Sequence, residues 1–307
     1  MPSSSSRSRF AWQPPAARAL RLLLDAVGGC VRDALMGRSC RDWDLATSAR
    51  PEETLRVFAG FRTAGTGLAH GTVTVLVDGM PLEITTYRVD GGYSDGRHPD
   101  AVRFTPRVEE DLARRDFTMN AVALRPGEPP VDPFGGAEDI RDRVIRCVGE
   151  PERRFSEDGL RVLRALRFAA ELGFSIEPAT EEALLAAAGM LRRVSAERVT
   201  RELSLLLCGA HAPGVLARYA EVLRQVCPVA EHAAERMAAL PETLAPRLAA
   251  LMEDCAPEEA ERALRALRFD RRTRTAALTL HTAAAEPLPE SLCALRRRMG
   301  RCGALWD

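Results

Sequence analysis

Two aspartates, Asp42 and Asp44, stand one residue apart in the stretch RDWDLAT and have the spacing of a metal site. In an extended strand, residues two apart point to the same side, with Cα atoms roughly 6.5 Å apart. Carboxylates so placed can share two divalent cations about 3.5–4 Å apart, the arrangement used for in-line phosphoryl and nucleotidyl transfer. The motif is short, and a solvated turn or an ion pair to Arg41 gives the same pattern.

A glycine pair, Gly28 and Gly29, precedes these aspartates and leads into a predicted helix over residues 31–36, closed by Gly37. Glycine allows a sharp turn and a close approach of the backbone to a ligand. A helix that opens there presents free N–H groups to an anion, and Arg32 adds a fixed charge. Gly29 and Arg32 therefore predict a phosphate cradle, with a plain tight turn as the alternative.

A second group of polar residues lies in EEDLARRDFTMN. Arg114 and Arg115 can reach phosphates, and Asp116 or Asn120 can bond ribose hydroxyls. A junction between a helix and a strand with surface arginines fits the same residues. Glu83, in LEITTYR, is either a third carboxylate near the metals or a structural acceptor for a neighbouring arginine or threonine.

Four charged residues recur every three positions in EDGLRVLRALRF, for which we predict one helix over residues 157–168. They are Asp158, Arg161, Arg164 and Arg167. One interpretation is an ion pair on a solvated helix face. The other is base recognition. Cytosine and adenine each offer an amino donor beside a ring-nitrogen acceptor, which an aspartate beside an arginine complements. Uracil and guanine would leave both side chains unpaired, at about 1–3 kcal/mol per buried group.

The elements that must position these residues change in type along the chain. Residues 51–59 predict a helix, and residues 71–77 and 82–89 are two β-rich runs joined by the turn Asp78-Gly79. Residues 91–100 predict a loop between strands, and residues 131–148 a turn and the last strand of the domain. From Pro151 the periodicity is helical nearly to the end. The fold class is therefore α+β, with an all-α second half.

The composition excludes several classes of site. The formal net charge is zero, so any basic surface must be local. All 43 basic residues are arginine, which excludes a Walker P-loop lysine and a Schiff-base lysine. The eight cysteines are scattered without a C-x-x-C pair, which indicates reduced thiols in a cytoplasmic protein. The apolar run over residues 20–24 is too short to span a membrane.

Taken together, these stretches resemble a known family. The matching stretches are VGGCVRDALMGR, RDWDLAT, GLAHGTVTV, LEITTYR, YSDGRHPDAVRF, EEDLARRDFTMNA, DPFGGAEDIRDRVIRCVG, EDGLRVLRALRF and ERVTREL, in family order over residues 27–207. By them the chain resembles the bacterial class II tRNA nucleotidyltransferases, the CCA-adding enzymes of the polymerase-β-like superfamily. The resemblance implies a nucleotidyltransferase head with a small mixed sheet, followed by an all-α neck and body. It divides the chain into a disordered tail (1–15), a head (16–150), a neck (151–210) and a body (211–307).

The resemblance also implies roles for individual residues. Mg²⁺ would bind at Asp42 and Asp44, the catalytic carboxylates. The expected nucleotide contacts are Gly29, Arg32, Arg115, Asp158, Arg161, Arg164 and Arg167. Of these, Asp158 and Arg161 would read the incoming base. The substrates implied are CTP, ATP and the tRNA 3′ end, whose hydroxyl would attack the α-phosphate and release pyrophosphate. No membrane is expected, and the oligomeric state stays open.

The chain departs from the family pattern in three places. The segment before Gly28 is short, and Asp25 stands where an apolar strand residue is expected. His98 replaces an arginine in the loop. The body looks shortened, with a reduced or absent tail. Two alternatives follow: a relative that adds only A, only CC or a poly(A) tail, and a catalytically impaired RNA-binding remnant. The DGRHPD loop argues against CC-only addition.

Overall fold

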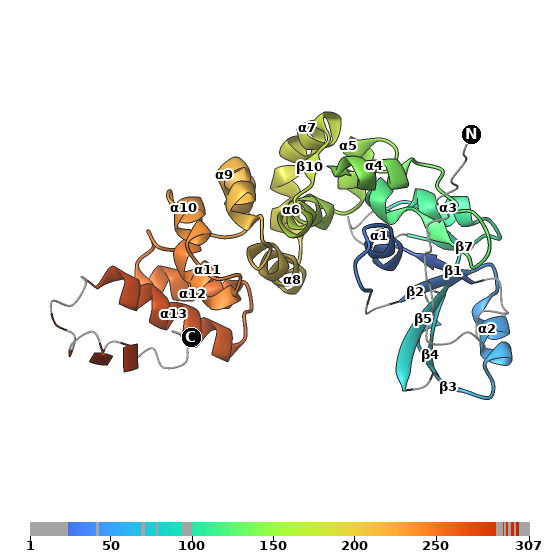
Figure 1. Cartoon of the computed structure of the whole chain (residues 1–307), viewed down its shortest axis with the longest axis horizontal. Coiled ribbons are helices and arrows are strands. Elements are labelled where there is room, and N and C mark those ends of the chain that lie inside the picture. The colour runs from blue at the N-terminus through green and yellow to red at the C-terminus, as the bar shows by residue number, and fades with distance from the viewer. Residues whose placement is uncertain are drawn as a thin grey trace, which may run out of the picture. The chain divides into compact units, whose positions relative to one another are not determined.

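The computed structural model describes residues 24–40, 43–68, 71–77, 79–93 and 100–286, together with residues 291, 293, 296–297 and 299–300. These residues form two compact units. The first contains the described residues up to 142 and residues 146–149, and the second contains residues 143–145 and the described residues from Glu150 onward. The first unit holds the main sheet and the second is mostly helical (Figure 1), which confirms the predicted α+β class.

A six-stranded mixed sheet lies at the centre of the first unit, in the order β3-β4-β5-β2-β1-β8. The strands β2 and β5 run parallel, and the other neighbouring pairs are antiparallel. The strands are β1 (Leu24–Val27), β2 (Asp44–Thr47), β3 (Arg62–Gly67), β4 (Thr72–Val77), β5 (Met80–Thr86) and β8 (Ala123–Leu124). The β-rich run predicted over residues 71–77 is β4, which pairs with β5. The run predicted over residues 82–89 covers most of β5 but extends past its end at Thr86 into β6 (Arg88–Asp90), which belongs to another sheet.

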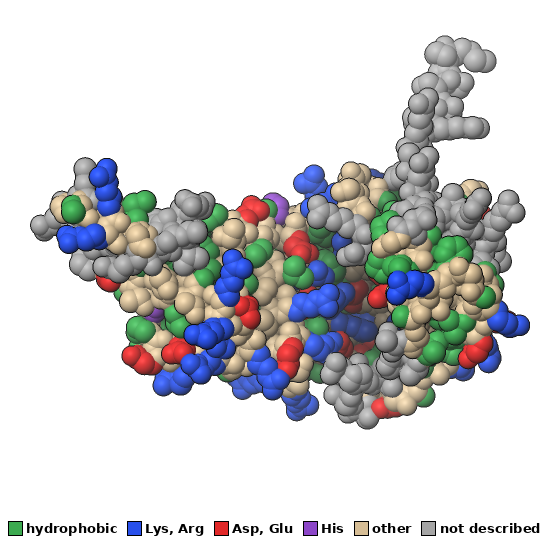
Figure 2. Space-filling model, turned by 90° about the horizontal axis from the view of Figure 1, so that it is seen from below, with side chains coloured by type: hydrophobic (Ala, Val, Ile, Leu, Met, Phe, Trp, Pro, Cys, Tyr) green, Lys and Arg blue, Asp and Glu red, His purple; other side chains and the backbone are tan. Residues whose placement is uncertain are grey.

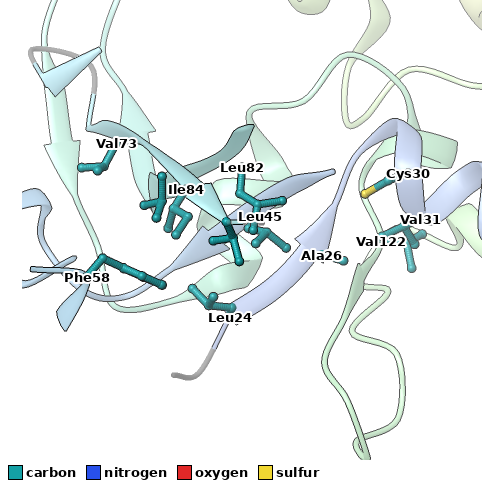
Figure 3. Close-up of a cluster of buried hydrophobic side chains, with 12 residues drawn as sticks. Leu24, Ala26, Cys30, Val31, Leu45, Phe58, Val73, Leu82, Ile84 and Val122 are labelled. Carbon is teal, nitrogen blue, oxygen red and sulfur yellow. The ribbon is translucent and has the colours of Figure 1, made fainter. Parts of the chain in front are cut away.

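Apolar side chains from two helices cover one face of this sheet. These helices are α1 (Gly29–Leu35) and α2 (Pro51–Val57), as the periodicity predicts. Figure 3 shows Leu24 and Ile84 of the sheet packed with Phe58, which follows α2. Val31 of α1 belongs to the same buried cluster.

The other face of the sheet packs against a shorter set of elements. Buried Val108 and Leu112 of α3 belong to a second apolar cluster together with Ala46 of β2. The remaining elements of this unit are β6 (Arg88–Asp90), β7 (Val102–Phe104), α3 (Val108–Ala113), the 3₁₀ turn η3 (Thr118–Asn120) and α4 (Gly136–Asp142). The strands β6 and β7 form a separate antiparallel pair.

Asp25, the aspartate that stands in the first strand where an apolar residue is expected, is buried and hydrogen-bonded. Asp25 on β1 is 1% exposed, and its carboxylate accepts two hydrogen bonds from Arg125, at 3.0 and 3.1 Å. The hydroxyl of Tyr87 donates a further hydrogen bond to it. A buried charge requires such partners. Despite the short segment before it, β1 pairs with β2 on one side and β8 on the other.

The second unit is a succession of helices with one small sheet. Its helices are α5 (Pro151–Glu157), α6 (Leu160–Leu172), α7 (Pro178–Ala187), the 3₁₀ helix η4 (Ala188–Arg193), α8 (Ala196–Leu207), α9 (Ala212–Leu223), α10 (Ala233–Ala238), α11 (Leu244–Leu251), α12 (Pro257–Ala266) and α13 (Arg271–Ala285). The strand β9 (Val144–Ile145) pairs in parallel with β10 (Ser175–Ile176). The prediction that residues 131–148 end in a strand of the first domain is therefore wrong, because that strand pairs within the second unit.

The single helix predicted over residues 157–168 is also wrong. The helix α5 ends at Glu157, and Asp158 has extended backbone angles of φ −153° and ψ 107°. Its Oδ1 accepts a hydrogen bond from the backbone N–H of Leu160, where α6 begins. An aspartate that bonds the backbone two residues ahead competes with continuous helix. Of the four charged residues, Asp158 precedes α6, and the three arginines lie within it.

The surface carries charges of both signs. Figure 2 shows arginine and carboxylate side chains interspersed over one face, as the zero formal net charge implies. No helix among the described residues has the length and hydropathy needed to cross a membrane.

Candidate active site

Asp44 is the first residue of β2, and its register partner on the parallel strand β5 is Glu83. The residues that follow them, Leu45 and Ile84, are buried in the core, whereas Asp44 and Glu83 are exposed. Side chains alternate between the faces of a sheet, so both carboxylates project from the same face at adjoining positions. The structure therefore places Glu83 beside Asp44, a position that the sequence left open.

The carboxylates have the donor chemistry that Mg²⁺ prefers. Asp42, the other predicted ligand, lies outside the described residues. Among the residues that are described, no group of three or more His, Cys, Asp or Glu side chains has the arrangement of a metal site. Mg²⁺ is commonly held by one or two carboxylates plus water and substrate phosphates, and Asp44 with Glu83 fits that pattern. The assignment of Asp42 and Asp44 as metal ligands stays a prediction.

The helix α1 begins next to Asp44. It opens at Gly29, after Gly28, whose φ of 77° is one that only glycine adopts readily. A Cβ atom at Gly28 would lie 3.0 Å from Nη1 of Arg115 and 3.4 Å from Oδ2 of Asp44. No side chain of the described residues caps the start of α1. Backbone N–H groups and a guanidinium, both of which bind phosphate, thus lie together here beside a carboxylate.

Arg32 is held at this helix by a chain of polar contacts. Its Nε and Nη2 donate to Oδ1 of Asp33 at 3.0 and 2.8 Å, and its Nη1 donates to Oδ1 of Asn120 at 3.0 Å. The amide nitrogen of Asn120 in turn donates to Oδ1 of Asp116 at 3.1 Å. Donor on one side and acceptor on the other fix the orientation of the Asn120 amide. Asp116 and Asn120 therefore orient Arg32, and their role in binding ribose stays a prediction.

The two neighbouring arginines at the end of α3 differ. Arg114 forms ion pairs with Asp111 at 2.9 Å and Asp90 at 3.6 Å. Arg115 donates over longer distances, 3.4 Å each, to Oδ2 of Asp111 and to the backbone oxygen of Asn120. Its buried Nε has no hydrogen-bond partner among the described residues. Arg115 is thus the arginine that lies beside Gly28, and the more weakly held of the two.

The cysteine of α1 is not a nucleophile. Burial raises the pKa of the Cys30 thiol to about 12. The thiol lies 3.1 Å from the backbone oxygen of Val27, to which it donates a hydrogen bond. It stays neutral at physiological pH, and only the thiolate attacks. Covalent catalysis at this position is therefore excluded.

In the second unit, Asp158 is bound by an arginine from another helix. Nη1 and Nη2 of Arg198, on α8, donate to its Oδ1 at 3.1 Å and its Oδ2 at 2.6 Å. Arg161 donates through Nη1 to Oε2 of Glu157 at 2.6 Å and to the backbone oxygen of Arg154 at 3.0 Å. The two residues proposed to read the base are therefore each oriented by a separate partner.

Arg164 and Arg167 share one buried carboxylate. Glu202 of α8 lies 3.6 Å from Arg164 and 2.8 Å from Arg167, whose guanidinium also stacks 3.9 Å from the centre of the Phe168 ring. The stripe of predicted nucleotide contacts is thus backed by α8.

Sequence reasoning missed Arg198 and Glu202 as individual residues. Both lie in ERVTREL, which contributed to the family resemblance only as a stretch. Their spacing of four residues puts them on one face of a helix, and this signal could have indicated a shared function.

Comparison with known proteins adds two family matches. The family described as "Poly A polymerase head domain" matches residues 24–146, and the one described as "Probable RNA and SrmB- binding site of polymerase A" matches residues 173–230. The first covers the sheet, α1 and Arg115. The second covers α8.

Individual relatives agree with these matches. The CCA-adding enzyme of Geobacillus stearothermophilus is 50% identical over 195 residues, which are 64% of this chain and 48% of that protein. The chain thus spans about half the length of the curated relatives it matches. The crystal structure of the Bacillus stearothermophilus CCA-adding enzyme in complex with CTP has a TM-score of 0.77 at 37% identity. That match covers 95% of this chain and 75% of the other.

A third likeness concerns the fold alone. A tRNA nucleotidyltransferase complexed with a primer tRNA and an incoming ATP analog has a TM-score of 0.74 at 23% identity, over 94% of this chain and 91% of that one.

Proposed function

The chain belongs to the family of CCA-adding enzymes, and we propose that it adds or repairs the 3′-terminal CCA of tRNA. The donors would be CTP and ATP, and each addition would release pyrophosphate. The relative that holds CTP in its crystal structure supports the choice of nucleotide. The proposal carries the expectation of a cytoplasmic enzyme, because a bacterial cell holds its tRNA and nucleoside triphosphates there.

One arrangement carries the proposal: the exposed carboxylate of Asp44 lies beside Glu83 on the neighbouring strand and, on its other side, close to Gly28 and Arg115 at the uncapped start of α1. Carboxylates that suit Mg²⁺ beside donors that suit phosphate are what nucleotidyl transfer requires.

The head residues would act on the triphosphate. The N–H groups at Gly29 and the guanidiniums of Arg32 and Arg115 would bind its oxygens and orient it for attack. Asp42 and Asp44 would hold Mg²⁺, with Glu83 beside them. When bound, the ion would neutralise phosphate charge and lower the pKa of a coordinated hydroxyl. The tRNA 3′-hydroxyl would then form the bond to the α-phosphorus, and pyrophosphate would leave.

The helical unit would select the base. Asp158 would accept a hydrogen bond from the amino group of cytosine or adenine, and Arg161 would donate to the neighbouring ring nitrogen. Uracil and guanine present the reverse pattern, which costs about 1–3 kcal/mol for each buried group left unpaired. Arg164 and Arg167 would assist at the triphosphate.

A second candidate is a relative that adds A alone or a poly(A) tail, because the matching head family is described by poly(A) polymerase. The test gives the purified protein Mg²⁺, each labelled nucleoside triphosphate in turn, and tRNAs that end before CCA, before CA and before A. Sequential C, C and A incorporation supports the proposal. Addition of A alone, or of long A tails, selects the second candidate. No incorporation at all overturns the enzyme assignment and favours an RNA-binding remnant.

A further inference from the structure

Helix α8 carries two polar residues that face α6 and hold the residues of the predicted base-reading stripe. Arg198 and Glu202 are four residues apart, so they lie on one face of the helix. Glu202 is 5% exposed, and the side chains of Arg198 and Asp158 are 24% and 14% exposed. Charged groups this far from water are kept where they are paired. The face they form is therefore a fixed structural support for the stripe.

Asp158 depends on this support more than the arginines do. It stands between α5 and α6 in an extended conformation, so no helix fixes its position. Its carboxylate is held by the backbone N–H of Leu160 on one oxygen and by both outer nitrogens of Arg198. A two-pronged guanidinium contact fixes the plane of a carboxylate as well as its position.

The hydrogen bonds from Leu160 and Arg198 leave the Asp158 carboxylate one lone pair with which to accept another. Oδ1 of Asp158 accepts from Leu160 at 3.1 Å and from Nη1 of Arg198 at 3.1 Å. Oδ2 accepts only from Nη2 of Arg198, at 2.6 Å, among the described residues. A carboxylate oxygen has two lone pairs, so Oδ1 is saturated and Oδ2 keeps one. An incoming donor is thus directed to a single lone pair.

We propose that Arg198 is a positioning residue for base selection: it turns Asp158 so that the remaining lone pair of Oδ2 meets the amino group of cytosine or adenine. The inference rests on the proposed function, in which Asp158 reads the base. Because the carboxylate cannot rotate away, the carbonyl oxygen of uracil or guanine meets an acceptor and is rejected. Without Arg198 the carboxylate turns freely, and this rejection weakens.

Glu202 provides the contrast that separates positioning from general support. It contacts Arg164 and Arg167, the residues expected near the triphosphate, which is the same in all four nucleotides. Arg198→Gln should therefore change discrimination, while Glu202→Gln should change KM by a similar factor for CTP, ATP, UTP and GTP. Arg201→Gln is the charge control, since Arg201 is an exposed arginine of the same helix.

The experiment measures kcat/KM for all four nucleotides on tRNA ending before CCA, with thermal unfolding of each variant to confirm folding. We expect the preference for CTP over UTP to fall about tenfold or more in Arg198→Gln. It should fall less in Arg198→Lys, which keeps the charge but loses the fork. Arg201→Gln and Glu202→Gln should keep the wild-type preference.

Two results overturn the inference. If the wild type selects CTP and ATP and a folded Arg198→Gln selects equally well, Arg198 has no positioning function and the proposed function stands. If Glu202→Gln loses as much discrimination between nucleotides as Arg198→Gln, packing of α8 against α6 supports all four residues alike, and Arg198 has no specific role in positioning Asp158. A wild type that incorporates nothing overturns the proposed function, and this inference with it.

Discussion

Asp44 and Glu83 occupy the same register position on the adjacent parallel strands β2 and β5, and both are exposed. Neighbouring strands lie about 4.8 Å apart, so two like charges stand side by side. Like charges opposite each other on a sheet destabilise it. A cation bound between them would remove this cost, which links the local geometry to the proposed metal site.

Glu83→Gln tests that link, because it removes one charge and keeps the shape of the side chain. We expect the Mg²⁺ concentration for half-maximal nucleotide incorporation to rise about tenfold. In the absence of Mg²⁺ the variant should be more stable to urea by about 0.5 kcal/mol, since the repulsion is gone. Glu52→Gln, an exposed glutamate of α2, is the control. An unchanged Mg²⁺ requirement in Glu83→Gln would exclude Glu83 from the metal site.

Asp44→Ala and Asp42→Ala address the assignment of the ligands themselves. Each should abolish incorporation of CTP and ATP, because the metal would lose one of its two predicted aspartate ligands. Binding of tRNA should remain within about twofold, since surface charges on the enzyme contribute most of the RNA affinity. The measurements are single-turnover incorporation and a gel-shift titration of tRNA. Activity retained in either variant refutes the metal assignment.

Gly28→Ala separates backbone strain from site geometry. A residue with a side chain at this positive φ costs on the order of 1–3 kcal/mol, and its Cβ would also lie 3.0 Å from Arg115. Gly37 has a similar φ of 71°, but a Cβ there meets nothing within 4 Å. Both alanine variants should therefore lose stability to urea, Gly28→Ala at least as much as Gly37→Ala. Only Gly28→Ala should raise KM for the nucleotides, and equal kinetic effects would contradict a phosphate cradle at Gly28.

The parts of the fold set by local pattern could be predicted from the sequence. The helix α2 begins at Pro51, and β4 and β5 follow the two β-rich runs, because helix starts and alternating strands depend on neighbouring residues. The pairing of β9 with β10 could not be predicted in this way, since its partner lies far along the chain.

The candidate site likewise has features that the sequence predicts and contacts that it does not. The sequence predicted a phosphate cradle at the glycine pair and Arg32, a metal ligand at Asp44 and a phosphate contact at Arg115. The structure brings Gly28, Asp44 and Arg115 close together. An ion pair between Asp158 and Arg161 was one of two interpretations of the sequence, yet the contact that fixes the Asp158 carboxylate comes from Arg198, 40 positions further on. Residue spacing within one helix does not predict contacts between two helices, so the sequence pattern could not identify Arg198 as the partner of Asp158.

Tyr87→Phe tests the buried carboxylate of β1. At neutral pH we expect a loss of about 2 kcal/mol, because the variant lacks the hydrogen bond to Asp25. Burial, and then Asp25, raise the pKa of Tyr87 above its ordinary value. The folded protein thus keeps a proton that the unfolded chain loses above pH ~10. This contribution is complete below pH ~10 and is lost above it, by up to about 1.4 kcal/mol per pH unit.

The difference in stability between wild type and Tyr87→Phe should therefore shrink between pH 8 and pH 11. Urea unfolding at both pH values measures it. Tyr219, whose pKa is also raised by burial and Glu181, is present in both proteins and cancels. A difference that does not change with pH would show that the phenol of Tyr87 titrates normally.

Arg161→Ala distinguishes base reading from phosphate binding in the second unit. Arg161 is held by Glu157 and by the backbone oxygen of Arg154, away from the carboxylate that binds Arg164 and Arg167. Its loss should remove the donor for the ring nitrogen and lower discrimination against UTP and GTP by about 1–3 kcal/mol, or roughly 5- to 150-fold. The KM for CTP should change by less than this factor, because the triphosphate contacts remain. Competition between labelled CTP and UTP measures the first quantity and initial rates the second, so unchanged discrimination would mean that Arg161 only stabilises α5 against α6.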